Sequence, residues 1–497
     1  MPSGKLILAI DQGTTSSRAV LFDGSANVLG SVQREITQLY PHPGWVNQDA
    51  EHIWDVTLDV TTRVLAETGV DLAEIAGIGI TNQRETTVLW DRATGFPVAP
   101  AIVWQSRQTA LLVEEIERRG MAETYQRITG LIPDAYFSAT KIAWMLQQDD
   151  DLRRRAEAGD ICFGTIDSWL IWNLSGGTTH VTDYSNASRT MLYDIRTCAW
   201  SQDLLEDLQI PAAILPEVRG NSEVLTETAT GLFGRAIPIA GVAGDQQAAL
   251  FGQACFEPGE AKNTYGTGCF LLMQTGTDVT VSSHKLLSTI AWGIDGKIEY
   301  ALEGSIFVTG AAVQWLRDGL GIIRDASEIE ALAGSVTDSA GVSFVPALSG
   351  LGAPFWDADA RGVIGGLTRG TTAAHIARAT LDAIAFQSRD VLEAMQADSG
   401  IRLGELRVDG GAAQNDLLMQ IQADVLGVPV VRPKVVETTV RGAAFLAGLA
   451  TGVWKNREEL RTSWEVDRRF EPAIPDAERE QRYTQWRGAI RRALTSA

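Results

Sequence analysis

The chain has 497 residues, of which 45% are hydrophobic and 21% charged, a composition typical of a globular protein with two to four domains. Its 42 Lys and Arg residues stand against 62 Asp and Glu residues, and the net charge of −20 excludes nucleic acid as an expected partner because phosphate would be repelled. No segment approaches the roughly 18 uninterrupted apolar residues of a membrane span, and the amino-terminal apolar run is too short for a signal peptide. We therefore expect a cytoplasmic protein with no integral membrane segment.

The first part of the chain predicts a β-meander, a helix and a polar corner. Residues 5–11 form an apolar run stopped by an acid, and residues 17–23 form a second run, so we expect two buried strands joined by a polar turn at 12–16. Apolar residues at helical spacing predict an amphipathic helix over 49–68. Two more apolar runs flank the polar corner at 82–85 and are expected to be strands.

The pattern restarts beyond the middle of the chain. Residues 105–215 are mainly helical in pattern, and an apolar strand at 237–243 then leads into a helix. After Pro258-Gly259 a strand, a Gly-Thr-Gly turn at 266–268 and another strand follow. We place the domain boundary here, which gives an N-terminal domain over residues 1–253 and a C-terminal domain over residues 254–497.

Both halves thus open with a strand, a glycine–threonine turn and a strand. A duplicated architecture that faces a central cleft explains this pairing, whereas two unrelated hairpins are the simpler explanation while no other motif is considered. Late in the chain, periodicity predicts a long amphipathic helix over 371–397. A strand at 406–409 then ends in Gly410-Gly411, and a helix is expected from about residue 413.

The glycine–threonine turns are candidate phosphate sites. The chain has neither a GxxxxGK[ST] loop nor a GxGxxG motif, so a bound nucleotide needs another cradle. In such a turn glycine lets backbone N–H groups approach phosphate oxygens, and hydroxyl groups add donors. The hydroxyl donors are Thr14, Thr15, Ser16 and Thr267. Arg18 could neutralise phosphate charge and Asp11 could hold hydrated Mg²⁺, although a solvated hairpin is the alternative.

Two strand-to-helix junctions carry further candidates. Gly410-Gly411 permits close approach of a ligand, and Asn415 in the following turn could bind an adenosine, although paired glycines often serve only tight packing. Asp245 follows an apolar strand, where a carboxylate could act as general base on an alcohol. The alternative role for Asp245 is a helix N-cap.

A polar pair and three aromatic residues could line a site for a small polyol. Arg84 can donate to hydroxyl oxygens and Glu85 can accept from hydroxyl hydrogens, a combination that suits a vicinal diol. Trp104, Tyr136 and Phe270 could form walls against the C–H face. The alternatives are a surface ion pair and ordinary core packing.

Taken together, these residues resemble the FGGY family of carbohydrate kinases over nearly the whole chain. Six blocks occur in the family's order and approximate spacing: Asp11–Arg18, Asn82–Thr87, Gly244–Leu250, Asn263–Leu272, Leu302–Val308 and Val408–Gly411. Two longer signature regions of the family also look present, at 136–148 and 362–382. Each block alone is weak, whereas six in order favour the functional interpretation of the matching residues.

The resemblance implies a fold and an activity. The expected fold is α/β, an actin/hexokinase-like ATPase fold of two domains, each with an RNase H-like core, that close on an active-site cleft. The expected reaction is Mg²⁺- and ATP-dependent transfer of the γ-phosphate to the terminal hydroxyl of glycerol, which gives sn-glycerol 3-phosphate and ADP. A homo-oligomer, a dimer or a tetramer, is also expected.

The resemblance also implies roles for individual residues. Glycerol would contact Arg84, Glu85, Trp104, Tyr136, Asp245, Gln246 and Phe270. The adenine nucleotide would contact Thr14, Thr15, Ser16, Arg18, Thr267, Gly310, Gln314, Gly411 and Asn415. Asp245 would be the general base, and Asp11 with Asp245 would hold Mg²⁺.

Two alternatives stay open at this point. The first is a kinase of the same family that acts on a tetritol or a pentulose, since one extra carbon is a subtle change. The second is an actin- or chaperone-like protein that ATP switches and that binds a partner without a small substrate. That class does not need the Arg84-Glu85 corner or the Asp245-Gln246 pair.

Overall fold

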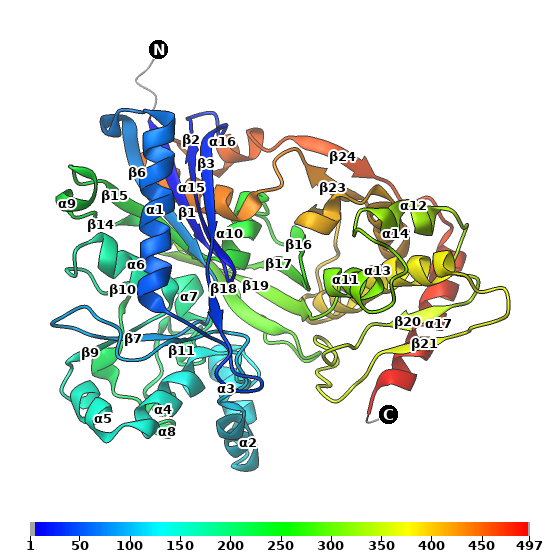
Figure 1. The fold of residues 1–497 in the computed structure, drawn as a ribbon, viewed down its shortest axis with the longest axis horizontal. Helices are drawn as coiled ribbons and strands as arrows, with labels where there is room; N and C mark the ends of the chain where they lie inside the picture. The colour runs from blue at the N-terminus through cyan, green and yellow to red at the C-terminus, as the bar shows by residue number, and fades with distance from the viewer. Residues whose placement is uncertain (1–4, 496–497) are drawn as a thin grey trace.

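The computed structural model describes residues 5–495 and contains two large mixed β-sheets that lie side by side (Figure 1). The strands of the first sheet are, in spatial order, β14 (Ser222–Glu227), β15 (Pro238–Gly244), β6 (Ile75–Asn82), β1 (Leu6–Gln12), β2 (Ser16–Phe22) and β3 (Val28–Glu35). Those of the second are β18 (Leu287–Ile294), β19 (Lys297–Ile306), β17 (Cys269–Gly276), β16 (Ala261–Tyr265), β22 (Leu406–Asp409), β23 (Val430–Pro433) and β24 (Val466–Phe470). Helices cover both sheets, so the predicted α/β class is confirmed.

The two sheets repeat one arrangement of five strands. In the first, β1, β2 and β3 are antiparallel neighbours, and β6 and then β15 continue on the other side of β1 in parallel. In the second, β16, β17 and β19 are antiparallel, and β22 and then β23 continue beside β16 in parallel. The two glycine–threonine turns join the first two strands of each set. They therefore occupy equivalent positions in a duplicated architecture, and the explanation by unrelated hairpins is wrong.

The first sheet is buried on both faces because its central strands are apolar throughout. In β1, Leu8 and Ile10 pack with α1 (Ala50–Thr68) and α6 (Ile166–Leu174) on one face. Ile7 and Ala9 pack on the other face with α10 (Asp245–Gly252) and α15 (Thr438–Thr451). The predicted helix over 49–68 is confirmed as α1, whose N-cap is Asp49.

Helix α15 comes from the last quarter of the chain and yet packs on the first sheet, as its orange ribbon among the blue strands in Figure 1 shows. Small residues allow this approach: a Cβ on Gly442 would lie 1.8 Å from the carbonyl oxygen of Ala248, and one on Gly79 would lie 2.2 Å from that of Ala443. The division of the chain at residues 253 and 254 stays a prediction, and α15 connects the second part of the sequence to the first sheet.

The second sheet packs mainly on α13 (Ala373–Ser399), α14 (Asp416–Leu426) and α17 (Asp476–Ala493). The helix predicted over 371–397 is confirmed as α13. The helix predicted from about residue 413 begins later, because residues 411–414 form a 3₁₀ turn and α14 starts at Asp416. Asn415 is the N-cap, where its side chain accepts a hydrogen bond from the backbone of Leu418, and this contact fixes the later start.

Smaller elements complete the two halves. Those of the first half include α2 (Ala110–Arg118), α3 (Ala122–Thr129), α4 (Ser138–Gln148), α5 (Asp150–Glu157), α7 (Tyr184–Ala187), α8 (Gln202–Asp207), α9 (Thr230–Phe233), β4 (Gln38–Leu39), β5 (Asn47–Gln48), β7 (Val88–Asp91), β8 (Ala101–Ile102), β9 (Ile161–Gly164), β10 (Val181–Asp183), β11 (Tyr193–Asp194), β12 (Ala199–Trp200) and β13 (Glu217–Arg219). Those of the second include α11 (Gly310–Asp318), α12 (Glu328–Gly334), α16 (Arg457–Thr462), β20 (Ser343–Val345) and β21 (Val363–Gly365). None of the helices within residues 5–495 is both long and apolar enough to cross a membrane.

Candidate active site

The second glycine–threonine turn lies against two other predicted nucleotide segments. The backbone N–H of Gly310, the first residue of α11, donates to the carbonyl oxygen of Gly266 at 3.1 Å, and that of Ala311 donates to Thr267 at 3.0 Å. Gly410 packs on the end of β16, where a Cβ would lie 2.4 Å from the carbonyl oxygen of Tyr265, and its φ of 84° favours glycine. A Cβ on Gly411 would meet only open space. The structure thus brings Thr267, Gly310 and Gly411 together around one turn.

Two further nucleotide candidates sit on helices beside this turn. Gln314 is exposed and lies one helical turn beyond Gly310 in α11. The side-chain oxygen of Asn415 caps α14, so only the amide nitrogen of this side chain is left to contact a base.

The side chains of the first turn are partly engaged within the protein. The hydroxyl of Thr14 accepts a hydrogen bond from the indole of Trp104 at 2.8 Å, and that of Ser16 accepts one from Gln33 at 2.9 Å. Thr15 is exposed. Arg18 forms an ion pair with Glu437, just before α15, so its positive charge is partly compensated.

Asp11, near the end of β1, lies close enough to Asp245, the first residue of α10, for the two carboxylates to interact. Burial raises the pKa of Asp11 to about 7; the charge of Arg18 lowers it, whereas Asp245 and Glu437 raise it. No hydrogen bond to the Asp11 carboxylate is found in the described part of the chain, and the side chain of Asp245 is 31% exposed. A desolvated carboxylate beside a second one is a fitting pair of ligands for a divalent cation shared with phosphate oxygens and water.

The predicted polyol residues converge on Arg84. Its Nε lies 3.1 Å from Oδ1 of Asp245, and its two terminal nitrogens donate to the carboxylate of Glu303 at 2.6 and 3.0 Å. Arg84 is 2% exposed and Glu303 is fully buried. Because Glu303 lies on β19 of the second sheet, this bidentate pair fixes Arg84 across the two halves of the molecule.

Glu85 is held by a second buried arginine. Its backbone has a φ of 60°, in the left-handed region, and its carboxylate accepts from Nε of Arg189 at 2.7 Å. Arg189 also donates to Glu303 at 3.0 Å, so two arginines and two glutamates form one buried cluster. Burial raises the pKa of Glu85, whereas Arg84 and Arg189 lower it.

The three aromatic residues suggested as walls of a polyol site lie near one another. The ring centroid of Trp104 lies 5.4 Å from that of Tyr136 and 6.5 Å from that of Phe270, both in edge-to-face arrangements. All three side chains are half-buried. They can offer apolar surface to the C–H groups of a small ligand.

Two buried lysines support this site. Lys262, fully buried on β16, donates to Gln246 Oε1 at 2.5 Å and to Thr264 at 2.8 Å. Lys141, fully buried on α4, donates to the carbonyl oxygens of Tyr136 at 2.6 Å and Glu85 at 3.1 Å. Burial lowers the pKa of Lys141 to about 7 and that of Lys262 to about 8.

Four buried charged residues of the site were not predicted from the sequence: Arg189, Glu303, Lys141 and Lys262. Glu303 lay within a recognised block, and a charge in the middle of an apolar strand was a usable signal for a buried partner. Arg189 follows a short helix in a polar stretch, where nothing in the sequence distinguishes it from a surface residue.

Comparisons with known proteins show the family of the chain. The sequence model described as the N-terminal domain of the FGGY family of carbohydrate kinases matches residues 6–252, and the one for the C-terminal domain matches residues 261–451. The chain belongs to the FGGY family of carbohydrate kinases. It is therefore a member of a transferase family, and the prediction drawn from the six sequence blocks is confirmed.

Curated relatives in this family match the chain from end to end. A protein named glycerol kinase 2 from Thermotoga maritima is 58% identical over 490 residues, with 99% of each chain covered. A glycerol kinase from Symbiobacterium thermophilum is 60% identical over 487 residues, with 98% of each covered.

Solved structures confirm the two-domain FGGY kinase fold. The crystal structure of Plasmodium falciparum glycerol kinase with ADP matches with a TM-score of 0.94 at 37% identity, with 99% of each chain covered. A gluconate kinase from Lactobacillus acidophilus matches with a TM-score of 0.90, also over 99% of each chain, and at 22% identity this likeness concerns the fold alone.

Proposed function

We propose that this chain transfers the γ-phosphate of ATP to the terminal hydroxyl of glycerol, giving sn-glycerol 3-phosphate and ADP. One observation carries the choice of substrate: the near full-length identity of 58% to a curated glycerol kinase. The converging side chains of Arg84, Asp245 and three aromatic residues support it, because they suit a small molecule that is polar on one side and apolar on the other.

Glycerol binds with its hydroxyl groups toward the buried charges. Arg84 donates to hydroxyl oxygens, and Glu85 accepts from hydroxyl hydrogens through the lone pairs that Arg189 leaves free. Gln246, held by Lys262, offers its amide, and the rings of Trp104, Tyr136 and Phe270 face the C–H groups. The buried arginine–glutamate cluster keeps these donors and acceptors in place before the substrate arrives.

Asp245 acts as the general base. Its Oδ1 is held by the backbone N–H of Gln246 at 2.7 Å and lies 3.1 Å from Arg84, which fixes the carboxylate. No described residue hydrogen-bonds Oδ2, which is therefore available to the terminal hydroxyl. As that oxygen attacks the γ-phosphorus, Asp245 takes its proton, so the nucleophile does not have to develop a full negative charge.

The two turns hold the nucleotide phosphates. Backbone N–H groups and hydroxyls of Thr14, Thr15, Ser16 and Thr267 surround the phosphate oxygens, Gly310 and Gln314 lie behind the second turn, and Gly411 with Asn415 faces the adenosine. Arg18 adds positive charge near the phosphates. Asp11 and Asp245 are the residues that would hold Mg²⁺, which would neutralise phosphate charge.

The contributions from both halves imply closure around the substrates. Water must be excluded from the γ-phosphate if ATP is not to be hydrolysed, so the halves close on the cleft between them once glycerol and nucleotide are bound. We place this reaction in the cytoplasm, where ATP is supplied, and we expect a homo-oligomer, a dimer or a tetramer.

Identification of the product tests this function. The protein is incubated with glycerol, ATP and Mg²⁺, and the product is treated with a dehydrogenase specific for sn-glycerol 3-phosphate. Complete oxidation of the product, with one ADP released per molecule, is the expected result. ATP hydrolysis that does not depend on glycerol, with inorganic phosphate as the product, would instead favour an ATP-switched binding protein.

A further inference from the structure

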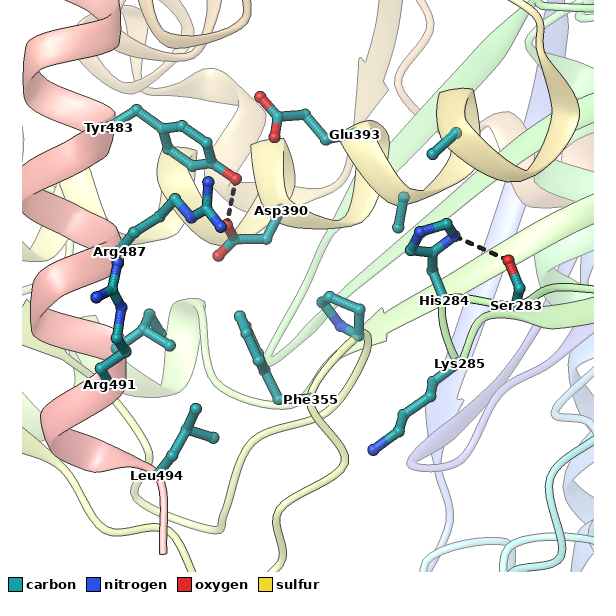
Figure 2. A pocket seen from close by; sticks show the side chains of 14 residues that line it. Ser283, His284, Lys285, Phe355, Asp390, Glu393, Tyr483, Arg487, Arg491 and Leu494 are labelled. Carbon is teal, nitrogen blue, oxygen red and sulfur yellow. Dashed lines mark hydrogen bonds between the residues drawn. The ribbon is translucent and has the colours of Figure 1, made fainter. Parts of the chain in front are cut away.

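A second ligand site is indicated on the outer side of the second half. A cavity of about 520 Å³ lies between α13, α17 and the loops that carry His284 and Phe355. Figure 2 shows the side chains that line it. It shares no lining residue with the site assigned to glycerol and ATP. Any ligand bound here is therefore separate from the phosphoryl-transfer reaction.

The walls of this cavity carry unpaired positive charges. Arg487 and Arg491 project from α17, and Lys285 extends from the opposite wall (Figure 2). Within the described part of the chain, none of the three side chains forms an ion pair. Arg487 lies close enough to Asp390 for its charge to lower the pKa of that carboxyl, so it is partly compensated. In a protein with 62 acidic residues and a net charge of −20, the excess of positive charge around this cavity still favours an anionic ligand.

The two carboxylates of the cavity are already engaged. Asp390 accepts hydrogen bonds from the hydroxyl of Tyr483 and the indole of Trp486, both at 2.7 Å, and burial raises its pKa to about 7. Glu393 is paired with Arg389 at 2.8 Å. His284 is likewise bound to Asp398 at 2.7 Å, so the net charge offered to a ligand comes from the two arginines of α17 and the lysine.

The remaining walls are apolar. Phe355 stands between the basic groups in Figure 2. Ile490 of α17 and Leu494, which directly follows this helix, also line the cavity. A ligand that fits has an anionic group for the arginines and lysine and a compact apolar body for Phe355. We propose that this cavity binds a small organic phosphate ester with an apolar body.

Phenyl phosphate is a suitable probe, and its binding can be measured by isothermal titration calorimetry. A saturating, non-hydrolysable Mg²⁺–ATP analogue and glycerol are present so that phosphate does not bind at the catalytic turns. Two matched ligands serve as controls: phenol, which lacks the phosphate charge, and inorganic phosphate, which lacks the ring. We expect phenyl phosphate to bind more tightly than either, and its Kd to rise with KCl because salt screens exposed charges.

Substitutions test whether phenyl phosphate binds in this cavity. In the double variant Arg487→Ala, Arg491→Ala the Kd for phenyl phosphate should rise at least about tenfold, which corresponds to about 1.4 kcal/mol. Both arginines are exposed, so the variant should fold. Arg127→Ala, an exposed arginine on α3 with no ion pair among the described residues, is the matched control and should leave the Kd unchanged.

A Phe355→Ala variant should bind phenyl phosphate and inorganic phosphate with similar affinity. The proposal is wrong if the wild-type protein does not bind phenyl phosphate, if phenol binds equally well, or if the double variant keeps the wild-type Kd. Since binding is measured directly and not through turnover, each of these results is independent of the reaction proposed for the catalytic site.

Discussion

Replacing Glu303 by Gln removes one negative charge from between two buried arginines. The carboxylate accepts two hydrogen bonds from Arg84, at 2.6 and 3.0 Å, and one from Arg189, at 3.0 Å. Burial opposes its ionisation, but Arg189 and Arg84 lower its pKa to about 2, so it is charged throughout the physiological range. The side chain of Gln has nearly the shape of Glu, but its amide turns an N–H group toward the guanidinium groups. N–H donors of the two arginines are then left without an acceptor.

The expected loss of stability follows from this burial. Breaking a buried ion pair by removing one partner costs about 3–5 kcal/mol. Over 497 residues the unfolding entropy amounts to ~1 kcal/mol/K, so the Tm should fall by ~3–5 °C. Arg84 loses its fixed orientation as well, so the KM for glycerol should rise roughly tenfold or more while kcat changes less, as expected when uniform binding is lost.

Thermal unfolding and steady-state kinetics measure both effects. Glu115→Gln is the matched control, because Glu115 pairs with Arg118 at 2.6 Å on the surface, where such a pair contributes about 0–1 kcal/mol. A Glu303→Gln variant with the Tm and the glycerol KM of the wild-type protein would refute the argument. A control that loses as much stability as Glu303→Gln would refute it as well.

The remaining predictions concern the base, a buried lysine and a close helix contact. Asp245→Asn should lower kcat by roughly 10²–10⁴ with ADP affinity by calorimetry nearly intact, and near-normal turnover would exclude Asp245 as the base. Burial lowers the pKa of Lys141 to about 7, so between pH 7 and about 10 the unfolded chain binds a proton that the folded protein does not. The Tm of the wild-type protein minus that of Lys141→Met should therefore rise from pH 7 to pH 9, and a constant or falling difference would contradict the burial of Lys141. Gly442→Ala should lower the Tm because its Cβ would lie 1.8 Å from a carbonyl oxygen of α10, at a cost of about 1–3 kcal/mol. Gly488→Ala, a helical position with open space around it, should not lower the Tm, and equal losses in the two variants would contradict the close packing.

The strands and turns of this protein could be predicted because their signals are local. Short apolar runs stopped by charges give the bounds of β1 and β22 almost to the residue, and the restart of the pattern points to the second sheet. The start of α14 was predicted early because a 3₁₀ turn and a helix have similar apolar spacing over a few residues.

The supporting cluster of the site could not be predicted from local patterns. Glu303 and Arg189 are separated by more than 100 residues in the sequence. Burial of either charge is tolerated only because the opposite charge lies beside it. The same holds for α15, because nothing in its own residues indicates the sheet on which it packs. Side chains at strand ends, such as Asp245, were accessible to sequence analysis because turns concentrate functional groups.

Relative kcat/KM values for a panel of polyols and ketoses test the central claim most directly. Glycerol, erythritol, xylulose and gluconate are compared at saturating MgATP in an ADP-release assay with the wild-type protein. We predict the highest kcat/KM for glycerol, because Arg84, Glu85 and the aromatic walls suit a three-carbon polyol. A higher value for erythritol, xylulose or gluconate would contradict the assignment of glycerol as the substrate.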